Sequence, residues 1–198
     1  KILSQIKKRK NDIFIFSDFR HGMFHKKNIS ILSKSIPNNK LRIADTQVAS
    51  RWGNILDFSS FNLITPNEKE VRFALADQDS NISELTRNLQ KKMKFKALIL
   101  KLGKKGVFVI DRTKKSSKSF YLPSFAKNVV DPVGAGDALL AYSSLAFYFS
   151  NCMIKSSIIG NIAAAIECEN DGNVPVKASD VIKRLKEIEN FSKFKKNK

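Results

Sequence analysis

A glycine-rich turn followed by a carboxylate occupies residues 128–141, with the sequence NVVDPVGAGDALLA. Gly134 and Gly136 have no Cβ atom, so the backbone can turn tightly there and approach a ligand closely. The apolar stretch after Asp137 predicts a helix, whose first amides lack partners and whose dipole is positive at that end. The pattern therefore predicts an anion site beside Asp137, and phosphate is the anion most often found at such a site.

The carboxylate of Asp137 gives this turn a possible chemistry. A carboxylate beside a phosphate site is well placed to take the proton from an attacking hydroxyl group. The turn therefore indicates phosphoryl transfer to an alcohol. The alternative is structural: a glycine-assisted helix start, with an acidic residue that suits the helix dipole.

Polar side chains also follow the apolar runs that precede this turn. A continuous apolar run typical of a buried parallel strand occupies residues 13–16, and further strands are expected at 41–44 and 61–64. Ligands of open parallel sheets bind beyond the carboxyl ends of the strands, so Asp18 is a candidate substrate residue, with a loop-capping role as the alternative. Asn67 and Glu70 have the N-x-x-E spacing of a capping box, and the same side chains could lie near a hydrated Mg²⁺.

The remaining elements are expected to alternate along the chain. Further strands are expected at residues 97–100, 106–110 and 120–122, and helices at 26–36, 81–94, 138–150, 155–168 and 179–190. A hairpin turn is expected between the strands at 97–100 and 106–110. Strands that alternate with helices predict an α/β protein with a layered sheet.

Two other pairs of residues are weaker candidates. His21 and His25 are four residues apart and could share a helix face, but no third metal ligand is evident nearby. Arg51 and Trp52 could line a pocket or close the end of the sheet. Neither pair by itself indicates a specific chemistry.

The composition indicates a globular intracellular protein. The chain has 198 residues, of which 42% are hydrophobic, enough for one domain with a sizeable core. No apolar run reaches the roughly 18 residues that span a bilayer, and no signal peptide is evident. Cys152 and Cys168 lack CxxC spacing, which argues against a disulfide framework or zinc site and favours a cytoplasmic location.

The charge is strongly positive, at +18, with 36 Lys and Arg against 18 Asp and Glu. Such a balance is typical of nucleic-acid-binding proteins. The lysines, however, are spread along the chain, and dense runs occur at its ends, as at residues 193–198, where charge is solvated. A non-catalytic basic fragment that binds nucleic acid is therefore an alternative rather than the main prediction, and steeply salt-dependent duplex binding would favour it.

Four motifs occur in a characteristic order: SDFRHG, TPNEKE, KLGKKG and DPVGAGD. Together they resemble the ribokinase-like carbohydrate kinases, also called the phosphofructokinase-B family, over about residues 13–181. The SDFRHG turn and the ADTQ…LITPN stretch are most similar to the heptose-7-phosphate kinases of lipopolysaccharide precursor synthesis. The resemblance implies a three-layer α/β fold, with a mostly parallel sheet and helices on both faces.

The resemblance also implies roles for particular residues in phosphoryl transfer. Asp137 would be the catalytic base that activates a sugar hydroxyl. The amides of Gly134, Ala135 and Gly136 would form the anion hole for the γ-phosphate. Asp131 would belong to a loop that commonly holds a monovalent cation such as K⁺.

Other positions would bind ATP and its metal ion. Asn67 and Glu70 would hold Mg²⁺ and its waters against the ATP phosphates. The residues that would lie along the nucleotide are Lys101, Leu102, Gly103 and Gly106. Asn161, in the segment GNIAAA, would lie near the adenine.

The sequence departs from the family pattern in several places. Pro132 and Val133 precede GAGD, where the family often has Thr, and His21 stands where the heptose kinases carry a lysine. The family's Gly-rich sugar-binding motif and β-lid are not visible, so we expect the N-terminal portion and lid to be missing. Because the family often dimerises through that lid, a homodimer is expected for the full-length form.

These observations predict a kinase domain at residues 1–190 and a basic tail at 191–198. The predicted activity is ATP-dependent phosphoryl transfer to a hydroxyl of a sugar or sugar phosphate, of the heptose-7-phosphate type. The alternative enzyme is a kinase of another small alcohol, such as a nucleoside or a vitamin precursor. Neither prediction includes a membrane partner.

Overall fold

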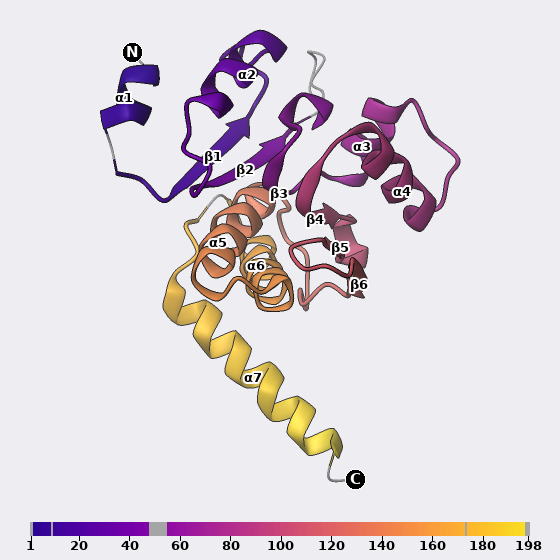
Figure 1. The fold of residues 1–198 in the computed structure, drawn as a ribbon. Coiled ribbons are helices and arrows are strands. Elements are labelled where there is room, and N and C mark those ends of the chain that lie inside the picture. The colour runs from indigo at the N-terminus through magenta and orange to yellow at the C-terminus, as the bar shows by residue number, and fades with distance from the viewer. Residues whose placement is uncertain (1, 9, 48–54, 173, 197–198) are drawn as a thin grey trace. The chain divides into compact units, whose positions relative to one another are not determined.

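The computed structural model describes residues 2–8, 10–47, 55–172 and 174–196 (Figure 1). The chain divides into two compact units, Lys1–Leu102 with Phe108–Tyr121, and Gly103–Val107 with Leu122–Lys198. In the first unit the helical elements are α1 (Ile2–Lys8), α2 (Lys26–Lys34), η1 (Ile55–Phe58), α3 (Glu68–Leu75) and α4 (Ile82–Lys92). The strands are β1 (Ile13–Asp18), β2 (Leu41–Thr46), β3 (Phe61–Ile64), β4 (Phe95–Lys101), β5 (Val107–Asp111) and β6 (Lys118–Leu122).

The six strands form one sheet in the order β1-β2-β3-β4-β5-β6. The pairs β1–β2, β2–β3 and β3–β4 are parallel, so the carboxyl ends of these four strands lie at one edge. The apolar side chains of β2, β3 and β4 are largely buried, whereas β1 is an edge strand in which Ile15 is 45% exposed, so the buried strand predicted at residues 13–16 is buried only in part. The predicted α/β fold with a mostly parallel sheet is confirmed.

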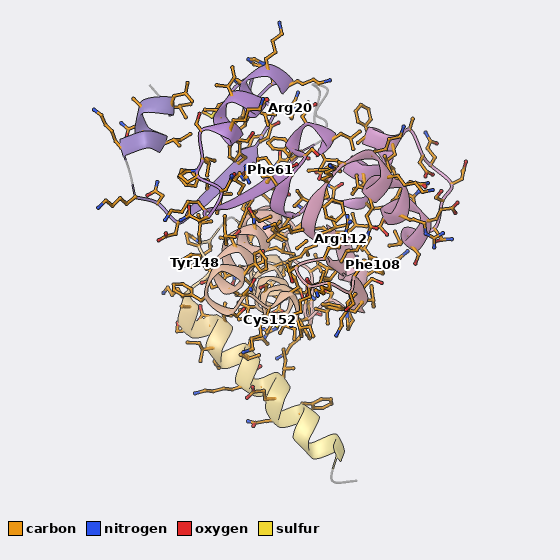
Figure 2. All side chains as sticks on the ribbon, viewed as in Figure 1. Arg20, Phe61, Phe108, Arg112, Tyr148 and Cys152 are labelled. Atoms are coloured by element: carbon orange, nitrogen blue, oxygen red, sulfur yellow. The ribbon has the colours of Figure 1, made fainter. Side chains whose placement is uncertain are left out.

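Aromatic packing holds β1 and β3 against the elements around them. Phe16 of β1 meets Phe61 of β3 edge to face, with ring centroids 5.1 Å apart. Phe58 of η1 lies at 5.5 Å from Phe61, and Phe24 at 5.4 Å from Phe16 (Phe61 is labelled in Figure 2). This core fixes the positions from which the polar residues at the strand ends emerge.

The strands β4 and β5 are neighbours in the sheet, and the short connection between them holds one 3₁₀ turn, η2 (Gly103–Lys105), so the hairpin expected from the sequence is confirmed. Gly106 follows with φ of +98°, a conformation that favours glycine. A Cβ atom there would overlap the carbonyl oxygen of Leu122 and lie 2.6 Å from the nitrogen of Ser124. Close backbone approach therefore explains the second glycine of the KLGKKG motif.

The second unit is built on three helices, α5 (Ala135–Ser150), α6 (Met153–Cys168) and α7 (Ala178–Lys196). The helices α5 and α6 lie side by side (Figure 1), and Gly160 permits the contact because a Cβ there would lie 3.0 Å from the Leu139 carbonyl oxygen. The helix α7 continues six residues beyond its expected end at Asn190, since its sequence holds no Gly or Pro to stop it. The predicted basic segment 191–198 therefore begins inside a helix.

No helix in the described part of the chain is long and apolar enough to cross a membrane.

Candidate active site

The GAGD segment forms the start of α5. Gly134 is the N-cap residue with φ of +84° and ψ of −21°, which places it in the left-handed region that favours glycine. The amide of Ala138 donates to the Gly134 carbonyl at 2.9 Å, the first bond of the helix. Asp137 is in the first turn, and its side chain is exposed. The geometry has the features of a helix-start anion site with a carboxylate next to it.

Backbone hydrogen bonds anchor the loop before α5 to the end of α6. The amides of Val130 and Asp131 both donate to the carbonyl of Cys168, at 2.7 and 3.2 Å. A carboxylate oxygen of Asp131 accepts from the amide of Val133 at 2.9 Å, which closes the turn into GAGD. Burial raises the pKa of the Cys168 thiol, and the carboxylates of Glu167 and Asp131 raise it further.

The N-x-x-E pair forms the capping box of α3. The Asn67 amide and Nδ2 donate to the two carboxylate oxygens of Glu70, at 2.7 and 2.6 Å. The Glu70 amide donates in return to Asn67 Oδ1 at 2.9 Å. Glu70 is only 3% exposed, so its carboxylate is held at the carboxyl end of β3. The structural interpretation of this motif is confirmed, and its metal role remains a prediction.

A buried ion pair lies at the same edge of the sheet. Lys101 Nζ is 2.8 and 3.1 Å from the two carboxylate oxygens of Asp45, and Thr65 Oγ1 donates to the same carboxylate at 2.9 Å. Lys101 was predicted to lie along the nucleotide, whereas no role was predicted for Asp45. The signals available for Asp45 were its place at the end of a predicted strand and within the ADTQ stretch, and neither indicated its partner, which is 56 residues away.

The backbone around Lys101 ties two predicted nucleotide motifs together. The Lys101 amide donates to the carbonyl of Pro66 at 2.9 Å, and Asn67 and Lys101 form an isolated parallel bridge. Leu102 packs against the core of the first unit. The start of KLGKKG therefore lies against TPNEKE, at the carboxyl ends of β4 and β3.

Asn161 lies within α6 and is 4% exposed. Its Nδ2 donates to the carbonyl of Pro123 at 2.8 Å, so the side chain secures the segment that follows β6. This bond is a structural role that the sequence did not indicate. The predicted place of Asn161 near an adenine remains a prediction.

Asp18 lies at the carboxyl end of β1 and is 3% exposed. Both of its carboxylate oxygens accept from Arg20, one from the amide at 2.9 Å and one from Nη1 at 2.7 Å (Arg20 is labelled in Figure 2). Arg20 has φ of +61°, which is strained for a side chain of this size. The loop-capping role of Asp18 is therefore present, and its substrate role stays a prediction.

The weaker candidates receive no support as a site. His25 is the N-cap of α2, where its ring nitrogen accepts from the amide of Asn28 at 3.4 Å. Within the residues that the structure describes, no group of three or more His, Cys, Asp or Glu side chains could hold a metal ion. Arg51 and Trp52 lie outside the described residues.

A family model for pfkB family carbohydrate kinases matches residues 11–174. The chain belongs to this family. Its curated relatives include the bifunctional protein HldE of Campylobacter fetus, 28% identical over 162 residues, and that of Campylobacter jejuni subsp. jejuni, 27% identical over 186 residues. These alignments cover 78% and 91% of the chain but only 33% and 38% of the relatives. The chain therefore spans little more than a third of the curated relatives' length.

Solved structures show the same fold. A ribokinase from Arabidopsis thaliana, complexed with ribose and ATP, matches with a TM-score of 0.75 and 20% identity, over 93% of this chain and 58% of that one. Phosphofructokinase-2 from Escherichia coli in complex with potassium matches with a TM-score of 0.76 and 17% identity, over 91% and 59%. These matches confirm the ribokinase-like fold predicted from the order of the motifs.

Each unit thus brings together its own set of predicted site residues. In the first unit, Asn67, Glu70 and Lys101 meet at the carboxyl ends of β3 and β4, with Asp45 added from β2. In the second unit, Asp131 and the GAGD segment share one loop and helix start.

Proposed function

We propose that the chain carries ATP- and Mg²⁺-dependent phosphoryl transfer to a hydroxyl group of a sugar or sugar phosphate. The observation that carries this proposal is the start of α5, where a left-handed glycine opens the helix and an exposed carboxylate stands in its first turn. Membership of the pfkB family of carbohydrate kinases supports it.

In the proposed reaction, the amides of Gly134, Ala135 and Gly136 bind the oxygens of the transferring phosphoryl group. Asp137 accepts the proton of the sugar hydroxyl group. The oxygen of that hydroxyl group forms the new bond to the γ-phosphorus. The bond between the γ-phosphorus and the bridging oxygen of ATP breaks, and ADP leaves with that oxygen. This mechanism relies on positioning and electrostatic stabilisation and needs no covalent intermediate.

The side-chain amide of Asn67 and the carboxylate of Glu70 are suited to bind the water molecules that surround a Mg²⁺ ion. Both side chains already bond each other in the capping box, and Mg²⁺ usually keeps several of its waters in nucleotide sites. When bound, Mg²⁺ neutralises negative charge on the phosphates. Lys101, Leu102, Gly103, Gly106 and Asn161 are the proposed nucleotide contacts, and Asp131 the proposed residue of a K⁺ loop.

The proposed substrate class is a sugar phosphate of the heptose-7-phosphate type. The SDFRHG turn and the ADTQ…LITPN stretch support it through their resemblance to heptose-7-phosphate kinases. The net charge of +18 would favour the approach of a phosphorylated sugar. Asp18, at the end of β1, is the proposed substrate residue from this segment.

The proposed role of Asp137 is tested by the variant Asp137→Asn. We expect kcat for ATP-dependent sugar phosphorylation to fall by about 10²–10⁴-fold, with unchanged thermal unfolding, because the exposed side chain contributes a proton acceptor rather than packing. Asp180→Asn, an acidic residue in the first turn of α7, is the matched control and should keep the rate. A wild-type rate for Asp137→Asn would remove Asp137 as the base.

A panel of acceptors tests the proposed substrate class. Heptose 7-phosphate, ribose, a nucleoside and a vitamin-type alcohol would each be offered with Mg²⁺ and ATP, and phosphorylated products measured by mass spectrometry. The proposal predicts the largest kcat/KM for the heptose phosphate. Preference for the nucleoside or the vitamin-type alcohol would instead identify a kinase of another small alcohol.

A further inference from the structure

The ion pair between Asp45 and Lys101 crosses the end of a strand. Asp45 lies in β2 and Lys101 ends β4, while β3 runs between them. Neighbouring strands are about 4.8 Å apart, so the lysine side chain reaches over the carboxyl end of β3 to meet its partner. That end leads directly into Thr65 and the capping box of Asn67.

This pair is shielded from solvent. Asp45 is 4% exposed, and the Lys101 side chain is 17% exposed. Taking two charges out of water is costly, and apolar residues of similar volume often stabilise a protein as well or better. Fold stability alone is therefore a weak reason for charges here, and their position suggests a role in ligand binding.

The position is the edge where the triphosphate would bind. The backbone of Lys101 is bonded to the Pro66–Asn67 segment, so Lys101 joins the proposed Mg²⁺ residues to the proposed nucleotide turn, and its ammonium group reaches Asp45 from there. A lysine there is attractive to phosphate oxygens. Its partner Asp45 cancels that attraction by holding the ammonium at two carboxylate oxygens.

We propose that Asp45 is a positioning residue that holds and neutralises the Lys101 ammonium, and that it thereby makes nucleotide binding depend on Mg²⁺. This inference rests on the proposed function, in which the triphosphate of ATP binds at these strand ends. With Lys101 paired, Mg²⁺ supplies the countercharge that the triphosphate needs. An unpaired Lys101 would supply part of that charge without the metal.

Calorimetry of ATP binding to the full chain tests this role, through the ratio of the Kd in EDTA to the Kd with Mg²⁺. Asp45→Asn should lower this ratio by on the order of tenfold, because the freed ammonium favours metal-free ATP. Lys101→Gln should raise it by a similar factor, because the negative charge of Asp45 then lacks the ammonium group that offsets it and repels metal-free ATP. Structural damage alone would change the ratio of Kd values in the same direction in both variants.

Two further variants separate local from general effects of charge. Asp12→Asn makes the same change in net charge before the amino ends of β1 and β2, where Asp12 pairs with Lys40 at 2.6 Å, and should leave the ratio unchanged. The double variant Asp45→Asn/Lys101→Gln has neither charge and should return the ratio toward the wild-type value. If Asp45→Asn does not fold, the rise expected for Lys101→Gln decides the question.

The outcomes distinguish this inference from the function on which it rests. One outcome is that the wild-type chain binds ATP in a Mg²⁺-dependent way while both single variants leave the ratio unchanged or move it in the same direction. That result would overturn the role of Asp45 alone. No Mg²⁺-dependent ATP binding by a folded wild-type chain would overturn the role of Asp45 and the proposed function together.

Discussion

At the residue scale, Asn67 combines a structural role with a proposed functional one. Its side chain accepts from the amide of Glu70 and donates to the Glu70 carboxylate, which secures the start of α3. The N-x-x-E spacing predicted that cap because capping depends on neighbours three residues apart. Asp45 had no comparable local signal, since its partner Lys101 comes near only after three strands have paired.

Comparing two helix caps separates these roles. Asn67→Ala and Asn81→Ala should each lower the free energy of unfolding by about 0.5–2 kcal/mol, because each asparagine caps a helix and accepts from a backbone amide. Only Asn67→Ala should also weaken Mg²⁺-dependent ATP binding. Urea unfolding and calorimetry measure the two effects. Equal ATP affinity in the two variants would show that Asn67 caps the helix and has no role in ATP binding.

At the element scale, the pattern of apolar residues predicted every strand of the sheet and most helix positions. Short segments rich in apolar residues identified β1 to β4, because strands of a parallel sheet are largely buried. The short helix η1 was missed, since four residues give too little periodicity. The hairpin between β4 and β5 was predicted from its glycines, both of which have positive φ, whereas the 3₁₀ form of its turn was not predicted.

The two glycines of the KLGKKG motif should differ in their tolerance of alanine. Gly106→Ala should lower the free energy of unfolding by about 2–5 kcal/mol. The backbone there is left-handed, and the added methyl group would also overlap the Leu122 carbonyl oxygen. Gly103→Ala should cost only about 1–2 kcal/mol, since φ is +59° but nothing lies within 4 Å of the added atom. Urea unfolding gives both values. Equal losses would mean that the close approach at Gly106 is absent in solution.

The contact between α7 and the end of α6 should be sensitive to acid. Arg184 donates to both carboxylate oxygens of Glu169, at 3.1 and 2.6 Å, and these bonds hold the pKa of Glu169 below its ordinary value of 4.5. Because the folded-state pKa is lowered, the stabilisation is present above about pH 4.5 and is lost as the pH falls through the folded-state pKa.

Urea unfolding at pH 7 and pH 3 measures this loss. Glu169→Gln should reduce the difference in stability between the two pH values. Glu187→Gln is the matched control, because Glu187 contacts the same Arg184 at 3.6 Å. The Glu187 side chain is 45% exposed, so this substitution should change the stability difference between the two pH values less. An unchanged pH difference in Glu169→Gln would show that the bidentate pair contributes no acid sensitivity.

At the scale of the whole molecule, the order of the motifs predicted the family and the fold. Family motifs are short and local, so they are visible in the sequence, and each lies at a strand end or helix start of the structure. The bonds that hold these motifs in place join distant residues, as between Asn161 and Pro123. Such bonds follow from the tertiary structure and have no spacing in the sequence that would predict them.

The central claim is a kinase-type nucleotide site that needs Mg²⁺, with Asp137 reserved for the chemical step. Calorimetry of ATP binding, with and without Mg²⁺, on the wild-type chain and on Asp137→Asn tests it most directly. We predict Mg²⁺-dependent binding of similar affinity in both proteins. Absence of binding to the folded wild-type chain, or its loss in Asp137→Asn, would contradict the claim.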